Sequence, residues 1–242
     1  MGHLISIFYQ TFIYQPLFNG LILIYNFLPG HDLGLSVIIL TAVIKLLTFP
    51  LNIKSAQAQQ AMTRVQPQIK EAQKRYANNP QEQTKAVSEI FKREKVNPLA
   101  NMLPLIIQLP IMVALYQLFL KGLWLGNGQL YNFVVKPGEL SPLFFGIIDL
   151  SKPNVVLAIL AGLAQLLQSL VIPVAAVQGD KNDPKYKMSK MMQKQMMFFL
   201  PVFITVTLLK LSSVLGLYWL VSSLLGAWQQ FILNKKFSQA TH

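Results

Sequence analysis

The stretch that decides the fold is GLSVIILTAVIKLLTFPLNI, residues 34–53. It holds 20 residues and a single charged side chain, Lys45. An α-helix rises about 1.5 Å per residue, so a helix of this length matches the ~30 Å hydrocarbon core of a bilayer. We therefore predict a membrane-spanning helix here.

The rest of the chain repeats this pattern. Its 242 residues are 53% apolar and 12% charged, with a mean hydropathy of +0.43, a composition that favours lipid over water as the surroundings. Further apolar runs lie at about 99–120, 154–177, 195–209 and 212–233. The sequence thus predicts an all-α polytopic membrane protein with five transmembrane helices. The run at 195–209 is short, and we expect it to form a tight hairpin with the run that follows.

Basic residues indicate which side each loop faces, because cytoplasmic loops retain Lys and Arg. The net charge is +12, and nine of the 21 basic residues lie between residues 54 and 97. Alternating the sides of successive loops leaves 16 basic residues inside and 4 outside, with Lys45 within a span. We expect the N-terminus outside and the C-terminus in the cytoplasm, in a bacterial plasma membrane.

The predicted segments follow from these runs and from the charges. They are an N-terminal interfacial amphipathic helix at 1–30, spans at 31–54, 98–121, 154–178, 195–210 and 211–233, a cytoplasmic helical hairpin at 55–97, an extracytoplasmic loop at 122–153, a cytoplasmic loop at 179–194 and a cytoplasmic tail at 234–242. The first segment is aromatic but interrupted by polar residues, which favours a position in the membrane interface. An uncleaved signal or a sixth span is the alternative.

The residue types needed for chemistry inside the membrane are missing from the spans. The chain has no cysteine, and its three histidines, His3, His31 and His242, lie outside the apolar runs. The aspartates lie between spans, so no carboxylate pair is available within the membrane. We predict no enzyme activity, no metal and no cofactor.

The hairpin at 55–97 is the largest polar segment. Apolar residues spaced by three and four form a seam along its first helix: Ala58, Met62, Val65, Ile69, Ala72 and Tyr76. Residues 78–80, NNP, predict a turn, and Val87, Ile90 and Phe91 predict a second helix lying against the first. Four of its basic residues, Arg64, Lys70, Lys74 and Arg75, are suited to anionic lipid.

Lys45 is the only charged residue well inside a span. A lysine at the centre of a membrane helix costs about 2.5–3.5 kcal/mol, so it must face water or a partner. No Asp or Glu lies within any span, but neutral polar residues do, and those expected around the cation are Thr41, Thr48, Asn101, Gln108, Gln165, Gln168, Ser222 and Gln229. Together they predict a wet, positively charged groove that attracts acidic, hydrated segments of another polypeptide.

Several motifs resemble those of the YidC/Oxa/Alb family of membrane-protein insertases, in the short form found in bacteria. They are NGL at 19–21, FPL at 49–51, MTRVQP at 62–67, LPLIIQLP at 103–110, DLS at 149–151, GLYW at 216–219 and QQ at 229–230. The resemblance implies a five-span core with a hydrophilic groove that is open to the cytoplasm and to lipid. The family's groove cation is an arginine, and Lys45 occupies that position. The resemblance also implies a protein that inserts newly made membrane proteins into the bilayer and helps them to fold.

Incoming spans are expected to dock beside Tyr218 and Trp219, and beside Met192 and Met196 in a methionine-rich surface suited to varied apolar partners. The expected partners are nascent membrane proteins and anionic lipids. The sequence leaves open whether the ribosome binds to the cytoplasmic loops and whether a Sec translocon takes part. No small-molecule substrate is expected. The short tail makes a dedicated ribosome-docking tail unexpected. Two other functions compete with insertion: a small anion channel or permease, and an assembly scaffold that shields spans without moving polar segments.

Overall fold

The computed structural model describes residues 2–97, 103–120, 130–138, 140–173 and 184–239. Strands β1 (Leu143–Phe144) and β2 (Ile148–Asp149) pair antiparallel. In chain order the helices are α1 (Gly2–Tyr9), the π-helical turn η1 (Gln10–Tyr14), α2 (Gln15–Phe27), α3 (Leu33–Arg75), α4 (Pro80–Arg93), α5 (Leu103–Leu120), α6 (Val155–Val171), α7 (Pro184–Leu208) and α8 (Ser213–Gln239).

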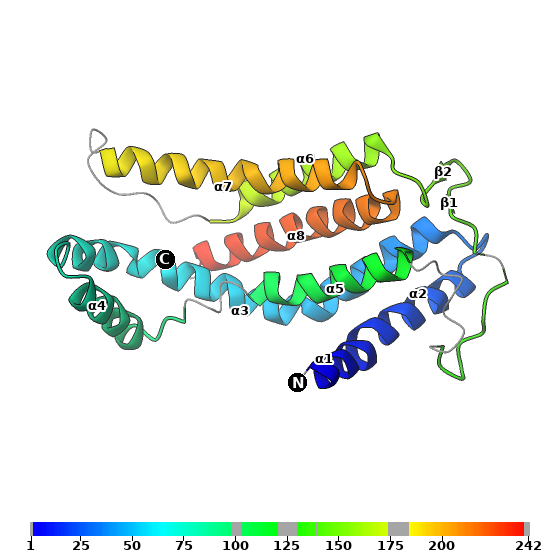
Figure 1. Cartoon of the computed structure of the whole chain (residues 1–242), viewed down its shortest axis with the longest axis horizontal. Helices are drawn as coiled ribbons and strands as arrows, with labels where there is room; N and C mark the ends of the chain where they lie inside the picture. The colour runs from blue at the N-terminus through cyan, green and yellow to red at the C-terminus, as the bar shows by residue number, and fades with distance from the viewer. Residues whose placement is uncertain (1, 98–102, 121–129, 139, 174–183, 240–242) are drawn as a thin grey trace.

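The long helices run along the longest axis of the molecule (Figure 1). Helix α6 packs against both α7 and α8, and α8 also packs against α3. One end of the molecule carries the small β-ribbon, and the other carries α4 (Figure 1). The long apolar helices and the mostly exposed apolar side chains on their outer faces are typical of a membrane protein.

The N-terminal elements α1, η1 and α2 form one continuous helix. Pro16 lacks the N–H that an α-helix would use, and the turn before it takes up the wider π register, in which the Gln15 amide donates to the Gln10 carbonyl. The segment Ser6–Phe27 is long and apolar enough to cross a membrane. Helix α2 packs obliquely on the first half of α3 (Figure 1). The interfacial position of residues 1–30 stays a prediction.

Helix α3 is 43 residues long and continues without interruption past the expected end of the first span at residue 54. Its start is capped by Asp32, whose carboxylate accepts the Leu35 N–H at 2.8 Å. Both Pro50 and Pro67 lie inside the helix without ending it. At about 1.5 Å per residue the helix is ~65 Å long, about twice the thickness of the hydrocarbon core. A single crossing of a bilayer therefore needs only about half of α3, and we call the part that follows residue 54 its projecting half.

The projecting half of α3 pairs with α4. Asn79 caps α4, and the two helices enclose a small apolar core that consists of Val65, Ile69, Ile90 and Val96. Ala61 packs at this contact, where the sequence pattern placed Ala58. Met62 and Ala72 of the predicted seam pack at the same contact, beside buried Val65 and Ile69.

Helix α7 begins earlier than the sequence pattern predicts. The expected loop at 179–194 is helical from Pro184 onward and continues directly into the apolar run. The residues of this first part are mostly Lys, Met and Gln, which have unbranched side chains with high helix propensity. Gly162 of α6 lets α7 approach closely, because a Cβ at this position would collide with the Thr205 hydroxyl of α7.

Residues 140–152, which we call the cap, close one end of the helix bundle. The Tyr25 hydroxyl accepts the Ser141 N–H at 3.0 Å, which ties the cap to α2. Buried Leu150 accepts hydrogen bonds through its carbonyl from the Ser212 hydroxyl (2.6 Å) and the Val214 amide (3.1 Å) in the α7–α8 turn. The expected extracytoplasmic loop is thus, over these residues, an ordered structure that joins the α2–α3 and α7–α8 turns.

Candidate functional site

Lys45 lies half-buried on α3, at the contact between α3 and α8. Its backbone carbonyl accepts a hydrogen bond from the Gln229 amide at 3.0 Å. The Gln229 carbonyl oxygen in turn accepts from the Asn52 amide, also at 3.0 Å. Buried Gln229 therefore holds α8 against α3 over two turns of α3, directly at the position of the cation. We call Lys45, Thr48, Asn52 and Gln229 the Lys45 cluster.

The Lys45 ammonium has no acidic partner in the part of the chain that the structure describes. The ion pairs found there are Arg75–Glu71, Arg93–Glu94 and Lys152–Asp149, all at the ends of the molecule or in the hairpin. The next residues on α3, Leu46 and Leu47, are exposed at 69% and 73%, as expected for a surface in contact with lipid. Lys45 therefore lies at the edge of an apolar surface.

The two threonines predicted beside Lys45 differ in position. The Thr41 hydroxyl donates to the Val37 carbonyl at 2.6 Å, and the residue is buried, so Thr41 does not line a wet groove. The Thr48 hydroxyl donates to the Ile44 carbonyl at 2.8 Å, but the residue is only half-buried and stays beside the cation. A helical threonine can satisfy its hydroxyl within its own helix, so it can be buried without water.

A second polar group lies between α6 and α8. The Gln165 carbonyl oxygen accepts from the Trp219 indole at 2.9 Å and from the Ser223 hydroxyl at 3.2 Å. Gln165 and Ser223 are buried, and Trp219 is half-buried. We call these three residues the Gln165 cluster. Its polar groups satisfy one another, which is the arrangement expected of an interhelical contact.

Tyr218, which was expected to contact substrate, lies inside the helix bundle. Its side chain is buried, with 1% exposed, and its hydroxyl accepts a hydrogen bond from the Gln108 amide of α5. Buried Ser222 lies within hydrogen-bonding reach of the same hydroxyl. A helix passing outside the bundle cannot touch Tyr218 in this conformation, because the tyrosine instead joins α8 to α5.

The remaining predicted residues are placed in part. Gln168 lies over Gly226 of α8, where a Cβ would press on its amide. Asn101 lies outside the described residues, and Met192 and Met196 lie on α7, where only their backbone is described. Asn52 was missed by the sequence analysis, although it lies seven residues after Lys45 and therefore on the same face of α3.

Comparison with known proteins gives the family. A model of the family described as "60Kd inner membrane protein" matches residues 23–240. Proteins named "Membrane protein insertase YidC" from Francisella tularensis subsp. novicida (strain U112) and subsp. tularensis (strain WY96-3418) are each 37% identical over 211 residues, which is 86% of this chain and 33% of each relative. The chain belongs to the 60Kd inner membrane protein family.

Membership in the 60Kd inner membrane protein family confirms the resemblance that the sequence motifs indicated. The chain spans about a third of the length of the curated relatives it matches. The family match runs through all the described helices from the end of α2 to the end of α8, so it includes both polar clusters and the cap.

The hairpin of this family member carries the basic residues expected of it. Arg64, Lys74 and Arg75 are exposed and Lys70 is half-buried, with Arg75 paired to Glu71 at 3.5 Å.

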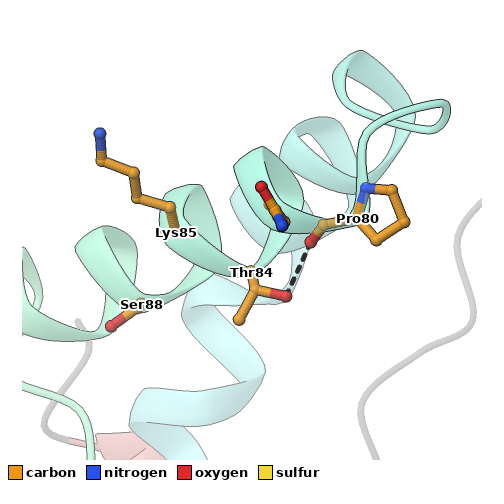
Figure 2. A pocket seen from close by; sticks show the side chains of 5 residues that line it. Pro80, Thr84, Lys85 and Ser88 are labelled. Carbon is orange, nitrogen blue, oxygen red and sulfur yellow. Dashed lines mark hydrogen bonds between the residues drawn. The ribbon is translucent and has the colours of Figure 1, made fainter.

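Figure 2 shows a shallow depression on the exposed face of α4, lined by Pro80, Gln81, Thr84, Lys85 and Ser88. The Thr84 hydroxyl donates to the Pro80 carbonyl of its own helix at 2.8 Å (Figure 2). Some 20 residues of continuous helix, about 30 Å, separate Lys45 from Val65, where α4 packs, so the depression is not part of the Lys45 cluster.

Proposed function

We propose that this protein inserts newly made membrane proteins into the bilayer and helps them to fold, using Lys45 to attract the polar part of an incoming chain. One observation carries the proposal: a membrane cation without an acidic partner among the described residues, held at the α3–α8 contact by Gln229. Relatives named membrane protein insertase in the same family support it.

The proposed architecture has five spans, formed by α3, α5, α6, α7 and α8. The first half of α3 has the length and apolarity of a span, and the apolar segments Ile106–Leu118, Val155–Val171 and Met197–Leu208 support three more. We place the hairpin and the C-terminus in the cytoplasm and the cap outside, on the distribution of basic residues. The exposed basic residues of the hairpin then meet anionic lipid headgroups.

The proposed groove is open to the cytoplasm and to lipid and closed outside. Exposed Leu46 and Leu47 beside the cation support the opening to lipid. The hydrogen bonds that the Leu150 and Lys152 carbonyls of the cap accept from the α7–α8 turn and the start of α8 support the closure. A closed outer end argues against the anion channel, because a channel needs a continuous path.

The proposed mechanism uses no covalent chemistry. An acidic tail entering the groove neutralises part of the charge of Lys45, whose burial in the membrane costs about 2.5–3.5 kcal/mol. The carboxylate of the tail and the ammonium of Lys45 stabilise each other, because each has lost hydrating water on entering the membrane and their attraction is stronger there. The incoming apolar span moves sideways into lipid along α3, and the tail is then released on the far side.

The test is insertion into liposomes that contain only the purified protein. The substrate is a single-span protein with a short acidic outer tail, and the readout is protection of the tail from added protease. We expect protection above that of empty liposomes, and loss of most of it in Lys45→Glu, because the variant repels the tail. The matched control is Lys235→Glu, which reverses an exposed charge near the end of α8, outside the hairpin. Equal insertion by the wild type and Lys45→Glu would overturn the role of the cation, and no insertion by folded wild type would overturn the proposed activity.

A further inference from the structure

The tip of the β-ribbon exposes large apolar side chains. Phe145 is 62% exposed and Ile147 is 83% exposed, on either side of Gly146. The pairing of Phe144 with Ile148 and the hydrogen bond from the Ile147 amide to the Phe144 carbonyl (3.0 Å) define a tight turn. Neither side chain helps to form the core of the bundle.

The backbone of this turn is unfavourable for the residue it carries. Phe145 has φ of 49° and Gly146 has φ of 71°, so both central residues of the turn lie in the left-handed region. Gly and Asn adopt this conformation easily, and such turns strongly prefer them, whereas a bulky aromatic residue is strained there. A phenylalanine at this position is therefore not explained by the needs of the turn.

The surrounding structure holds the turn in place. The second carboxylate oxygen of Asp32 accepts the Phe145 N–H at 2.5 Å, and the same carboxylate caps α3. The neighbouring Phe144 ring lies directly on Gly34, where a Cβ would collide with it. The Phe145 ring packs on the outer side of the Phe144 ring, with the two centroids 4.5 Å apart, and most of Phe145 and Ile147 stays exposed.

The apolar surface of the tip continues into the lipid-facing surface of the bundle. The ribbon leads within a few residues into α6, whose first residues Val155 and Val156 are 61% and 64% exposed. Phe133 and Val135 are 73% and 75% exposed, and the Val135 carbonyl accepts a hydrogen bond from the Asn26 amide at the end of α2 at 2.7 Å.

We propose that Phe145 and Ile147 insert into the interfacial layer of the leaflet on the cap side and anchor the cap to lipid. Aromatic residues are favoured at this depth, where a ring can lie between headgroups and acyl chains. The anchor would hold the cap level with the ends of α6 and α8. This inference concerns a lipid contact of the cap and does not depend on insertase activity.

The experiment uses the absence of cysteine from the chain, which allows single spin labels without further changes. Phe145→Cys and Ile147→Cys are labelled with a nitroxide in liposomes, and collision rates with oxygen and with a water-soluble nickel complex, loaded on both sides, are compared. The control is Ser88→Cys on the exposed face of α4. We expect the ratio of oxygen to nickel collisions to be several-fold higher at both tip positions than at residue 88.

A second variant separates lipid contact from turn structure. Phe145→Asn suits the left-handed backbone, so the ribbon should persist, but the label at Ile147→Cys should move toward water and its collision ratio should fall. Tip labels as open to the nickel complex as Ser88→Cys would overturn the proposal. So would dipolar broadening that disappears on dilution with unlabelled protein, because it would identify a second copy of the chain as the ligand.

Discussion

The Lys45 cluster and the Gln165 cluster both place polar groups against α8 within apolar surroundings, and they differ in how those groups are satisfied. In the Gln165 cluster one carbonyl oxygen accepts from both neighbours, and the set is largely buried. In the Lys45 cluster the Gln229 amide donates to the backbone carbonyl of Lys45 and the Asn52 amide donates to the Gln229 carbonyl oxygen, so the ammonium takes no part in these bonds. The first arrangement joins helices, and the second joins helices beside a cation that has no acidic partner among the described residues.

This difference bears on the expectation that the polar residues of the spans lie together in one groove. The sequence analysis assigned eight of them to one groove, yet Thr41 and Gln165 are buried, and so is Tyr218, which was expected to contact an incoming span. A neutral polar side chain in lipid needs one or two partners, which a neighbouring helix can supply, whereas a cation also needs a counter-charge or water. Charge is thus a better indicator of function than polarity.

The largest expected effect is on the charge itself. Lys45→Gln should lower the initial rate of insertion of an acidic-tailed substrate by about tenfold to a hundredfold, in line with the value of a charge in the membrane. Lys45→Arg should retain most of the rate, because it keeps the charge. The measurement is protease protection over time in liposomes, and a glutamine variant as fast as the arginine variant would show that the two clusters do not differ in function.

A smaller effect is expected where α6 meets α7. Gly162→Ala should lower the free energy of unfolding by about 1–3 kcal/mol, because the new methyl group overpacks the contact with Thr205. Gly216→Ala is the matched control, since its Cβ would lie 3.5 Å from that of Leu157, an ordinary contact. Thermal unfolding in detergent measures both, and equal midpoints for the two variants would contradict the close approach.

The Gln165 cluster should affect stability and leave charge selectivity unchanged. Gln165→Leu deprives the Trp219 indole and the Ser223 hydroxyl of their acceptor, and interhelical hydrogen bonds in membranes average about 0.6 kcal/mol. We expect a loss of about 1 kcal/mol in unfolding free energy. The ratio of insertion rates for acidic and neutral tails should stay at the wild-type value; a reduced ratio would place Gln165 in the groove after all.

Gln229→Leu should lower both the stability of the protein and the rate of insertion. It removes the hydrogen bonds to Lys45 and Asn52, so stability should fall by about 0.6–1.7 kcal/mol. Because the backbone of Lys45 is then less well held, the rate for acidic tails should also fall, but by less than in Lys45→Gln. A variant that loses stability while keeping the full wild-type rate would assign Gln229 to packing alone.

The smallest effect is expected at the cap. Hydrogen bonds from the Ser151 hydroxyl, the Lys152 ammonium and the Ser151 amide lower the pKa of Asp149 to about 2. A carboxyl with a folded-state pKa below its unfolded value, about 3.9, stabilises the fold above pH ~4, and this contribution is lost as the pH falls toward 2. The fall in thermal midpoint between pH 5 and pH 2 should therefore be slightly smaller in Asp149→Asn than in the wild type, with Glu89→Gln as the control. An identical fall in the thermal midpoint of all three proteins would show that Asp149 does not contribute to the pH dependence of stability.

Much of the fold follows from local patterns. Apolar runs of the right length predict α3, α5, α6 and α8, and the alternation of three and four residues predicts the contact of α3 with α4. The continuity of α3 past residue 54, from the predicted span into the predicted hairpin, and the early start of α7 were missed. A change from apolar to polar residues marks the end of a span, but it does not end a helix, because polar residues such as Lys and Gln also have high helix propensity.

The candidate site was predicted less completely than the fold. Lys45 stands out in the sequence because a charge inside an apolar run has no other explanation. Its neighbour Gln229 lies 184 residues further along the chain. Nothing in the sequence distinguishes Gln229 from the other amide side chains in the apolar runs. Asn52 was accessible to a helical-spacing argument, since it shares the face of Lys45.

Residue types and their order were sufficient for the membrane class, the isolated cation and the family, because each depends on composition, spacing or motif within short segments. Tertiary structure alone decided which polar residues meet Lys45, which are buried as contacts between helices, and how residues 140–152 form a cap over one end. These outcomes depend on how helices distant in sequence cross and turn about their axes. A rotation of one residue about a helix axis, 100°, exchanges a groove residue for a core residue.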